Sequence, residues 1–312
     1  LVFAGFLIKV SPNPSKLDSQ YLKCFLNTTS YWNWVTVNSM RSGQPGINGN
    51  EYGSLPIPLP PTITEQKAIA TALSDVDSLI SSLDKLITKK KAIKQGAMQE
   101  LLTPPHKGGI RLPGFSGEWE EITLGEIGQC IIGLTYSPTN VKDSGTLVLR
   151  SSNIQNGRFS SHDNVYVDCE IPEKLKVQEN DILVCVRNGS RNLIGKSLKL
   201  SNELAGQTWG AFMSVYRSKF NDFVVHLFNS NVIQRQIEEN LGATINQITN
   251  KTLNSFKVFI HKKVEEQKGI AKTQLDMDLE IETLENKKAK YQEIKQGMMQ
   301  ELLTGKTRLV WN

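Results

Sequence analysis

Apolar residues recur at alternating steps of four and three positions in the first third of the chain. This is the a/d spacing of a coiled-coil seam. Thr62 and Glu65 have capping-box spacing after a Pro-Pro pair, and Pro104-Pro105 stands at the far end. The pattern predicts one helix of about 40 residues and about 60 Å. Its expected seam is Ile69, Leu73, Val76, Ile80, Leu83 and Ile87.

The same unit occurs a second time near the C-terminus. Ile93–Thr103 reads IKQGAMQELLT, and Ile294–Thr304 reads IKQGMMQELLT. The match continues back to Glu65 and Glu266 without a gap. The second seam contains two polar interruptions, Gln274 and Lys288. Its expected partner residues are Ile270, Met277, Ile281 and Leu284.

A lone amphipathic helix of this length is poorly stabilised, so each copy needs an apolar partner. We expect the two copies to pack on each other as a helical rod. The alternative is that each helix packs mainly on its neighbouring domain.

Short apolar runs separated by Gly/Asn/Ser-rich turns fill the stretch between the helices. They predict an α+β globule with a curved sheet. An apolar face of helical spacing runs through Asp222–Leu241. The expected strands are Thr146–Arg150, Val165–Val167, Asp181–Val186, Ser197–Leu200 and Ala211–Tyr216.

Residues before the first helix match the end of that middle globule. Leu1–Val10 is expected to be a buried strand, Leu17–Leu26 a helix, and Ser42–Gly53 a loop. Gln44–Asn50 precedes the first long helix as Gly242–Lys251 precedes the second. Gly5-Phe6-Leu7 likewise echoes Ala211-Phe212-Met213.

The expected domains therefore follow the repeat. The first four are the end of a first globular domain, a long helix, a complete second domain and the second long helix. A short tail closes the chain. These domains span residues 1–60, 61–105, 106–261, 262–305 and 306–312.

Charge and cysteine content add little to this division. The net charge is +5, which tolerates a polyanion partner without requiring one. Four scattered cysteines with no CxxC or Cys/His metal spacing fit reduced thiols and a cytoplasmic protein. The apolar start is too short to span a membrane, so no membrane association is expected.

The sequence contains no complete catalytic motif of the kinds considered below. Asn188–Ser197 resembles a phosphate loop, but Ser190 stands where the spacing requires glycine, and no helix signal follows. The sequence lacks an NPPY-type tetrapeptide, a glycine-rich cofactor loop and a PD…ExK set, and its four histidines lie far apart. We expect a chain without enzymatic activity or bound cofactor.

Polar recognition chemistry remains. Arginine pairs bidentately with guanine, and asparagine or glutamine with adenine, while Gly/Ser-rich loops approach phosphates closely. Trp209 is expected to face outward near these loops. Each residue taken alone could equally be a solvated loop residue. The candidate DNA contacts are Arg150, Ser151, Asn153, Arg158, Arg187, Asn188, Ser190, Arg191, Lys196, Thr208, Trp209, Asn246, Gln247 and Lys251.

These features together resemble the specificity subunit of Type I restriction–modification enzymes. The resemblance is carried by Leu59–Lys67, Ile93–Thr103, Glu265–Leu303, Leu112-Pro-Gly-Phe115 with Trp119, and Gly242–Asn246.

The resemblance implies a non-catalytic reader of double-stranded DNA. Each recognition domain would read one half of a bipartite site, and the helices would form an antiparallel coiled-coil spacer. Methyltransferase subunits would dock on the helices, and restriction/translocase subunits would join the complex. S-adenosylmethionine, ATP and Mg²⁺ would belong to those partners.

The first recognition domain is expected to be shortened, because it contains no counterpart of the part of the second domain that precedes Gly210. We expect this chain to read one half-site, as a fragment, a silent cassette or a half-subunit completed by self-dimerisation. The competing functions are an interaction scaffold that does not bind DNA and a stand-alone nuclease.

Overall fold

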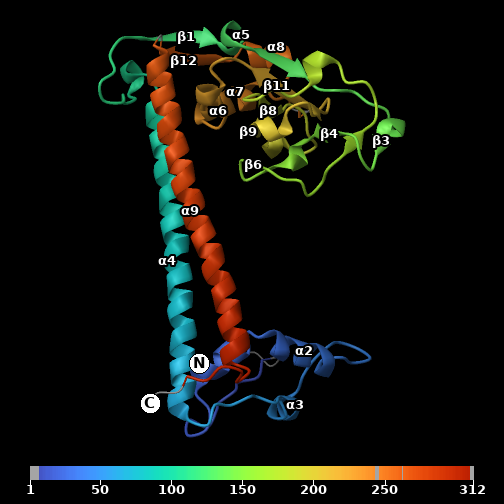
Figure 1. Ribbon diagram of the computed structural model, residues 1–312, viewed down its shortest axis with the longest axis vertical. Helices are drawn as coiled ribbons and strands as arrows, with labels where there is room; N and C mark the ends of the chain where they lie inside the picture. The colour runs from blue at the N-terminus through green and yellow to red at the C-terminus, as the bar shows by residue number, and fades with distance from the viewer. Residues whose placement is uncertain (1–6, 243–245, 262, 310–312) are drawn as a thin grey trace. The chain divides into compact units, whose positions relative to one another are not determined.

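The computed structural model describes residues 7–242, 246–261 and 263–309. They form two compact units (Figure 1). Unit 1 comprises residues 1–91 and 279–312, and unit 2 comprises residues 92–278. The long helices α4 (Ile63–Leu101) and α9 (Val264–Leu302) contribute residues to both units. No described helix combines the length and apolarity needed to cross a membrane.

In unit 1, α4 and α9 pair with each other, as predicted. Asp77 forms an ion pair with Lys295 at 2.6 Å, and Asp84 with Lys288 at 2.6 Å. Residue numbers rise along one helix as they fall along the other, so the pair is antiparallel. Of the predicted seam residues in unit 1, Ile69, Leu73, Leu83, Ile87 and Ile281 are buried, while Val76, Ile80 and Leu284 are half-buried.

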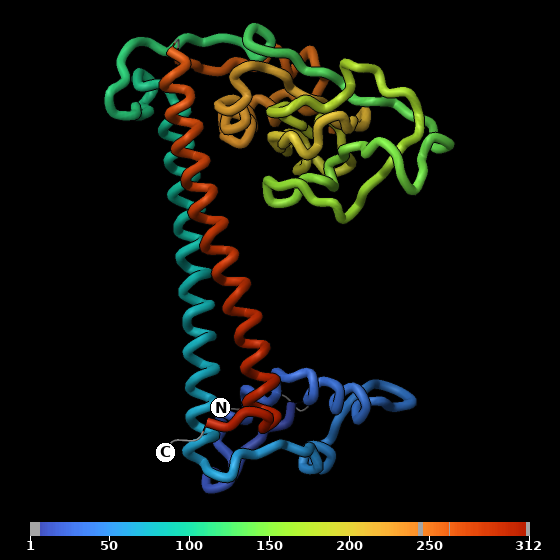
Figure 2. The backbone as a smooth tube through the Cα atoms, viewed as in Figure 1, coloured from blue at the N-terminus to red at the C-terminus, as the bar shows by residue number. Residues whose placement is uncertain are grey.

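The remaining elements of unit 1 are three short helices beside the start of α4 and the end of α9 (Figure 2). They are α1 (Ser19–Phe25), α2 (Thr29–Asn38) and α3 (Gly49–Gly53). Tyr21 packs in a core with Ile69, Leu73 and Leu303. Helix α1 confirms the helix predicted over Leu17–Leu26. The loop predicted over Ser42–Gly53 contains α3, which Asn48 and Glu51 stabilise through a capping box.

The expected buried strand at the start of the chain is wrong for the part that the structure describes. Residues 7–10 have no regular structure, and Leu7 and Val10 are exposed. Residues 1–6, including Gly5 and Phe6 of the proposed echo, lie outside the described residues.

Unit 2 contains all the described strands and confirms the α+β class. One four-stranded sheet has the order β2-β11-β8-β9 and is antiparallel throughout. A second has the order β10-β4-β7-β3, in which β10 and β4 are parallel. The pairs β1-β12 and β5-β6 complete the set. Their bounds are β1 Trp119–Thr123, β2 Gln129–Ile132, β3 Val141–Lys142, β4 Thr146–Leu149, β5 Ile154–Gln155, β6 Arg158–Phe159, β7 Tyr166–Val167, β8 Ile182–Cys185, β9 Ser197–Lys199, β10 Thr208–Trp209, β11 Met213–Arg217 and β12 Lys257–His261.

The helices of unit 2 cover the sheets and share one large core with them. Phe223, Phe228 and Ile233 are fully buried in this core, as are Val184 and Val215 of the central strands. The predicted helix over Asp222–Leu241 is broken into two, because Ser230 caps a new helix. The short helices are α5 (Leu124–Ile127), α6 (Asn221–Phe228), α7 (Asn231–Asn240) and α8 (Asn250–Asn254).

The helices before α4 repeat the helices before α9. Thr28 caps α2 as Ser230 caps α7, and Asn48 caps α3 as Thr249 caps α8. With the two caps aligned, Tyr31 of α2 corresponds to Ile233 of α7, and both are buried.

His226 of α6 faces the ends of the long helices within unit 2, where Lys94 and Asp278 form an ion pair at 2.5 Å. Burial and, to a smaller extent, the charge of Lys94 lower the pKa of His226 to about 4. Lys199, Asp222 and Asp278 also act on the imidazole.

We expect the stability of the chain to fall as the pH drops from about 6.5 toward 4. In that window the unfolded histidine binds a proton and the folded one does not, so acid favours unfolding by at most about 1.4 kcal/mol per pH unit. Urea unfolding at several pH values measures this slope. His226→Gln should flatten it, and an unchanged slope in the variant would contradict the assignment.

Candidate nucleic-acid interface

Two of the predicted recognition segments meet at one edge of unit 2. Arg187 follows strand β8 and forms an isolated bridge with Gln247. The backbone N–H of Asn188 donates to the carbonyl of Asn246 at 3.3 Å, and the Asn246 side chain donates to the carbonyl of Gly189 at 3.0 Å. The structure thus brings 187–192 and 246–248 side by side. Thr244 of the predicted segment lies outside the described residues.

A third segment joins them from the turn between β10 and β11. The carbonyl of Phe212 accepts from the backbone N–H groups of Val186 and Arg187, at 3.1 and 3.0 Å. Ala211 donates to Leu134 at 3.0 Å, which ties the turn to the loop after β2. We call the surface formed by residues 187–192, 211–212 and 246–247 the loop face.

The loop face is built from sequence without carboxylates. The stretches 129–142, 186–202, 205–221 and 246–264 contain no Asp or Glu, although the chain has 31 acidic residues. Arg187 and Arg191 are exposed, and Arg187 makes no ion pair with any described residue. Arg191 only reaches the carbonyls of Gly242 and Glu238, both at 3.4 Å. Such a surface attracts a polyanion.

The turn at Asn188 holds the loop in shape. Its side-chain oxygen accepts from the N–H of Ser190 at 2.9 Å, and its amide donates to the hydroxyl of Ser151 at 3.1 Å. Arg150 next to Ser151 is committed elsewhere, because its guanidinium pairs with Asp163 at 2.8 Å. The Ser152 side chain and the charge of Arg150 lower the pKa of the Asp163 carboxyl. Ser190 is exposed on the loop face, Asn188 and Ser151 are half-buried, and Arg150 is held in its ion pair with Asp163.

Three predicted DNA contacts are wrong, because the structure buries them. Trp209 has no exposed surface, and its indole N–H donates to the carbonyl of Ile131 at 3.0 Å. The hydroxyl of Thr208 donates to Leu175 at 2.8 Å within the core. Asn153 is fully buried and holds the turn after β4. Their polar groups stabilise the fold.

The other predicted contacts lie outside the loop face as defined. Lys251 is exposed on α8, Arg158 is exposed on β6, and Lys196 is half-buried before β9. They remain predictions. Phe212 was not among the predicted contacts, although an aromatic residue in a Gly-Ala turn before a strand was available as a signal.

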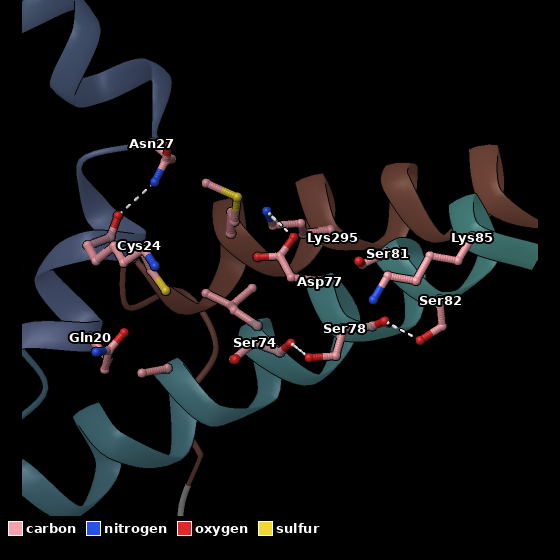
Figure 3. Close-up of a pocket in the computed structure, with 14 residues that line it drawn as sticks. Gln20, Cys24, Asn27, Ser74, Asp77, Ser78, Ser81, Ser82, Lys85 and Lys295 are labelled. Carbon is pink, nitrogen blue, oxygen red and sulfur yellow. Dashed lines mark hydrogen bonds and ion pairs between the residues drawn. The ribbon is translucent and has the colours of Figure 1, made fainter. Parts of the chain in front are cut away.

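A second polar site lies in unit 1. A cavity of about 450 Å³ is bordered by α1, α4 and α9 (Figure 3). The hydroxyls of Ser78 and Ser82 donate to carbonyls of their own helix, and Asp77 pairs with Lys295. Burial raises the pKa of the Cys24 thiol, so this cysteine is a poor nucleophile at neutral pH. The cavity shows no arrangement for nucleophilic catalysis among its described residues.

Comparison with known proteins decides between the remaining interpretations. The model of the Type I restriction modification DNA specificity domain matches residues 1–95 and 116–296. The chain belongs to this family. Its function is therefore to supply the DNA-sequence specificity of a Type I restriction–modification system, as the resemblance implied.

Relatives of this chain are specificity subunits of type I restriction enzymes. The chain is 31% identical to the type I restriction enzyme MjaX specificity subunit of Methanocaldococcus jannaschii, over 97% of this chain and 71% of the relative. It is 29% identical to the EcoKI specificity subunit of Escherichia coli, over 57% of this chain and 39% of the relative.

Solved specificity-subunit structures share the fold. The HsdS subunit from Thermoanaerobacter tengcongensis matches 94% of this chain and 71% of its own, with a TM-score of 0.54 and 17% identity. The S subunit from M. genitalium matches 93% of this chain and 74% of its own, with a TM-score of 0.60 and 17% identity. At this identity the likeness establishes the architecture of the family.

Proposed function

We propose that unit 2 of this specificity subunit reads one half of a bipartite DNA site through the loop face. The observation that carries the proposal is the meeting of Arg187, Arg191 and Gln247 on the loop face, none of whose three segments contains a carboxylate. Arginine and glutamine provide base-edge contacts, and the positive potential provides phosphate attraction. The loop is held by backbone hydrogen bonds to two neighbouring segments, so its side chains start from a fixed frame.

The long helices supply the rest of the proposed assembly. We propose that methyltransferase subunits dock on the α4–α9 pair, and that restriction/translocase subunits bind the resulting complex. S-adenosylmethionine, ATP and Mg²⁺ would then be held by those subunits. Helices α1 to α3 repeat only the end of the reading domain. A second copy of the chain, joined in a self-dimer, would therefore supply the second loop face. The molar mass of the purified chain in solution tests that dimer.

Replacing Arg187 and Arg191 together by alanine is expected to weaken DNA binding by at least tenfold at moderate salt. Each arginine that contacts a phosphate contributes about one unit to the slope of log K against log salt, so the slope should fall by about two. The assay measures binding of the chain, complexed with methyltransferase subunits, to a labelled duplex. The duplex is first enriched from a random library by the unaltered complex.

The matched control is Lys257→Ala with Lys199→Ala. Both lysines are exposed, lie on strands of unit 2 and pair with carboxylates, Glu121 at 3.3 Å and Asp222 at 2.7 Å. This control removes the same charge away from the loop face. If both variants lose the same DNA-binding affinity, net charge explains the effect and the loop face does not. Failure to enrich any duplex from the library would favour the scaffold function instead.

A further inference from the structure

Phe212 is the one large apolar side chain on the loop face, and it is 56% exposed. The guanidinium of Arg187 lies over its ring, 4.9 Å from the centroid. The ring is therefore supported from one side by a cation, while more than half of the residue remains open to solvent. A single exposed apolar side chain is normal on a protein surface, so what distinguishes Phe212 is its place beside the recognition loop and its contact with the guanidinium of Arg187.

The backbone fixes Phe212 in place. Its carbonyl accepts two hydrogen bonds from the neighbouring segment, at Val186 and Arg187. The N–H of Gly210 donates to Leu149 at 3.1 Å and that of Met213 to Gly210 at 2.8 Å, so the turn is tied on both sides of Phe212. Little ordering entropy remains to be lost when this ring meets a ligand.

The surroundings of the ring favour a nucleobase over a protein partner. Aromatic rings interleaved with arginines are the common platform for stacking bases, because every base has a π-face and arginine adds cation–π attraction. The other side chains of the loop face include Asn188, Gln247 and Arg191, and its three segments contain no carboxylate that would repel DNA. A protein-docking surface would instead be expected to present several apolar side chains together.

We propose that the free face of Phe212 stacks on a nucleobase at a partly unstacked step of the recognised DNA, with Arg187 closing the other face of the ring. The proposal rests on the DNA-reading role of the loop face. A wedge of this kind lets a protein favour flexible base steps, because the energy of unstacking depends on the sequence being deformed. Phe212 would thus add to specificity without a hydrogen bond to a base edge.

Three substitutions test it on the complex with methyltransferase subunits and the library-enriched duplex. Phe212→Ala is expected to weaken binding about tenfold, because stacking on one base is lost. Phe212→Leu keeps an apolar side chain without a ring and should lose nearly as much, whereas Phe212→Trp should bind as well as the unaltered chain. Ile110→Ala, which truncates an apolar side chain that is 49% exposed and lies outside both the loop face and the long helices, is the control and should bind normally.

Two readouts separate stacking from other roles. The salt slope should stay unchanged in Phe212→Ala, in contrast to its fall in the arginine variant. A 2-aminopurine scanned through the duplex should show one position whose fluorescence changes on binding and loses that change in Phe212→Ala and Phe212→Leu. Thermal unfolding of the free variant checks that it folds.

Each outcome decides the question. Full binding by Phe212→Leu would overturn stacking and indicate a simple apolar contact, such as one with a thymine methyl group. Loss of methyltransferase assembly by Phe212→Ala would overturn the proposal in favour of a protein contact. A normal Phe212→Ala with a defective arginine variant would overturn this inference alone. Failure to enrich any duplex would overturn it together with the DNA-reading role.

Discussion

Replacing Arg111 by alanine is expected to lower the free energy of unfolding by about 3 kcal/mol. Arg111 follows α4 and forms a two-point ion pair with Glu266 near the start of α9, with N–O distances of 3.1 and 2.6 Å. Glu266 has no exposed surface. Removing Arg111 leaves the buried carboxylate with the imidazole of His261, 3.2 Å from Oε2, beside it but without its guanidinium partner, and such a loss costs far more than the pair contributes.

The internal repeat provides a matched comparison. Glu65 is paired with Arg308 in unit 1 by the same two-point geometry, at 2.7 Å for both contacts. Glu65 also accepts the backbone N–H of Leu309 at 3.2 Å, and the Arg308 side chain is 45% exposed. Arg308→Ala should therefore destabilise the chain less than Arg111→Ala.

Urea unfolding followed by tryptophan fluorescence measures both variants. Adding Glu266→Gln to Arg111→Ala should restore part of the stability, because the unpaired charge disappears. If Arg111→Ala and Arg308→Ala have equal effects, burial of the carboxylate is not the deciding quantity. If the double variant has the lowest free energy of unfolding, Glu266 stabilises the chain through other contacts.

The repeat made these pairs partly predictable. Glu65 and Glu266 are equivalent positions that the sequence identifies directly, and the heptad pattern located both long helices to within a few residues. Helix periodicity depends on residues close together in the chain, so it can be recognised in the sequence. Arg111 and Arg308 could not be assigned as their partners, because the stretches after the two helices differ in length.

The composition of the loop face was predicted less completely for a physical reason. Arg187, Asn246 and Gln247, which the structure brings together there, were candidates because loops rich in Gly, Asn and Arg have a recognisable composition. Trp209 has the same local setting, yet strand pairing with β4 turns its ring into the core. Which side of a short strand faces inward depends on its register with distant strands, and that register is not written in the local sequence.

Gln274 presents the reverse problem, a polar residue in an apolar seam. It is completely buried in α9, and neither its amide nitrogen nor its amide oxygen has a hydrogen-bond partner among the described residues. A buried amide without partners costs about 1–3 kcal/mol. The equivalent position in the first copy is Leu73, which is also buried. The same helical position thus has an apolar solution in one half and a polar one in the other.

Exchanging the two side chains one at a time is expected to move stability in opposite directions. Gln274→Leu should raise the free energy of unfolding by about 2 kcal/mol, because a side chain of similar size replaces an unsatisfied amide. Leu73→Gln should lower it by about 3 kcal/mol, since it loses apolar burial and adds the same penalty. Urea midpoints of the two variants against the unaltered chain provide the measurement.

The outcome also tests why the glutamine is there. A buried polar residue in a helical seam can fix the register at the expense of stability. If Gln274→Leu gains stability but binds methyltransferase subunits poorly, the amide serves register or partner geometry. If it gains stability and assembles normally, the amide is a tolerated defect. A loss of stability in Gln274→Leu would contradict the unsatisfied state itself, and would mean that the amide is hydrogen-bonded in solution, for example to a buried water molecule.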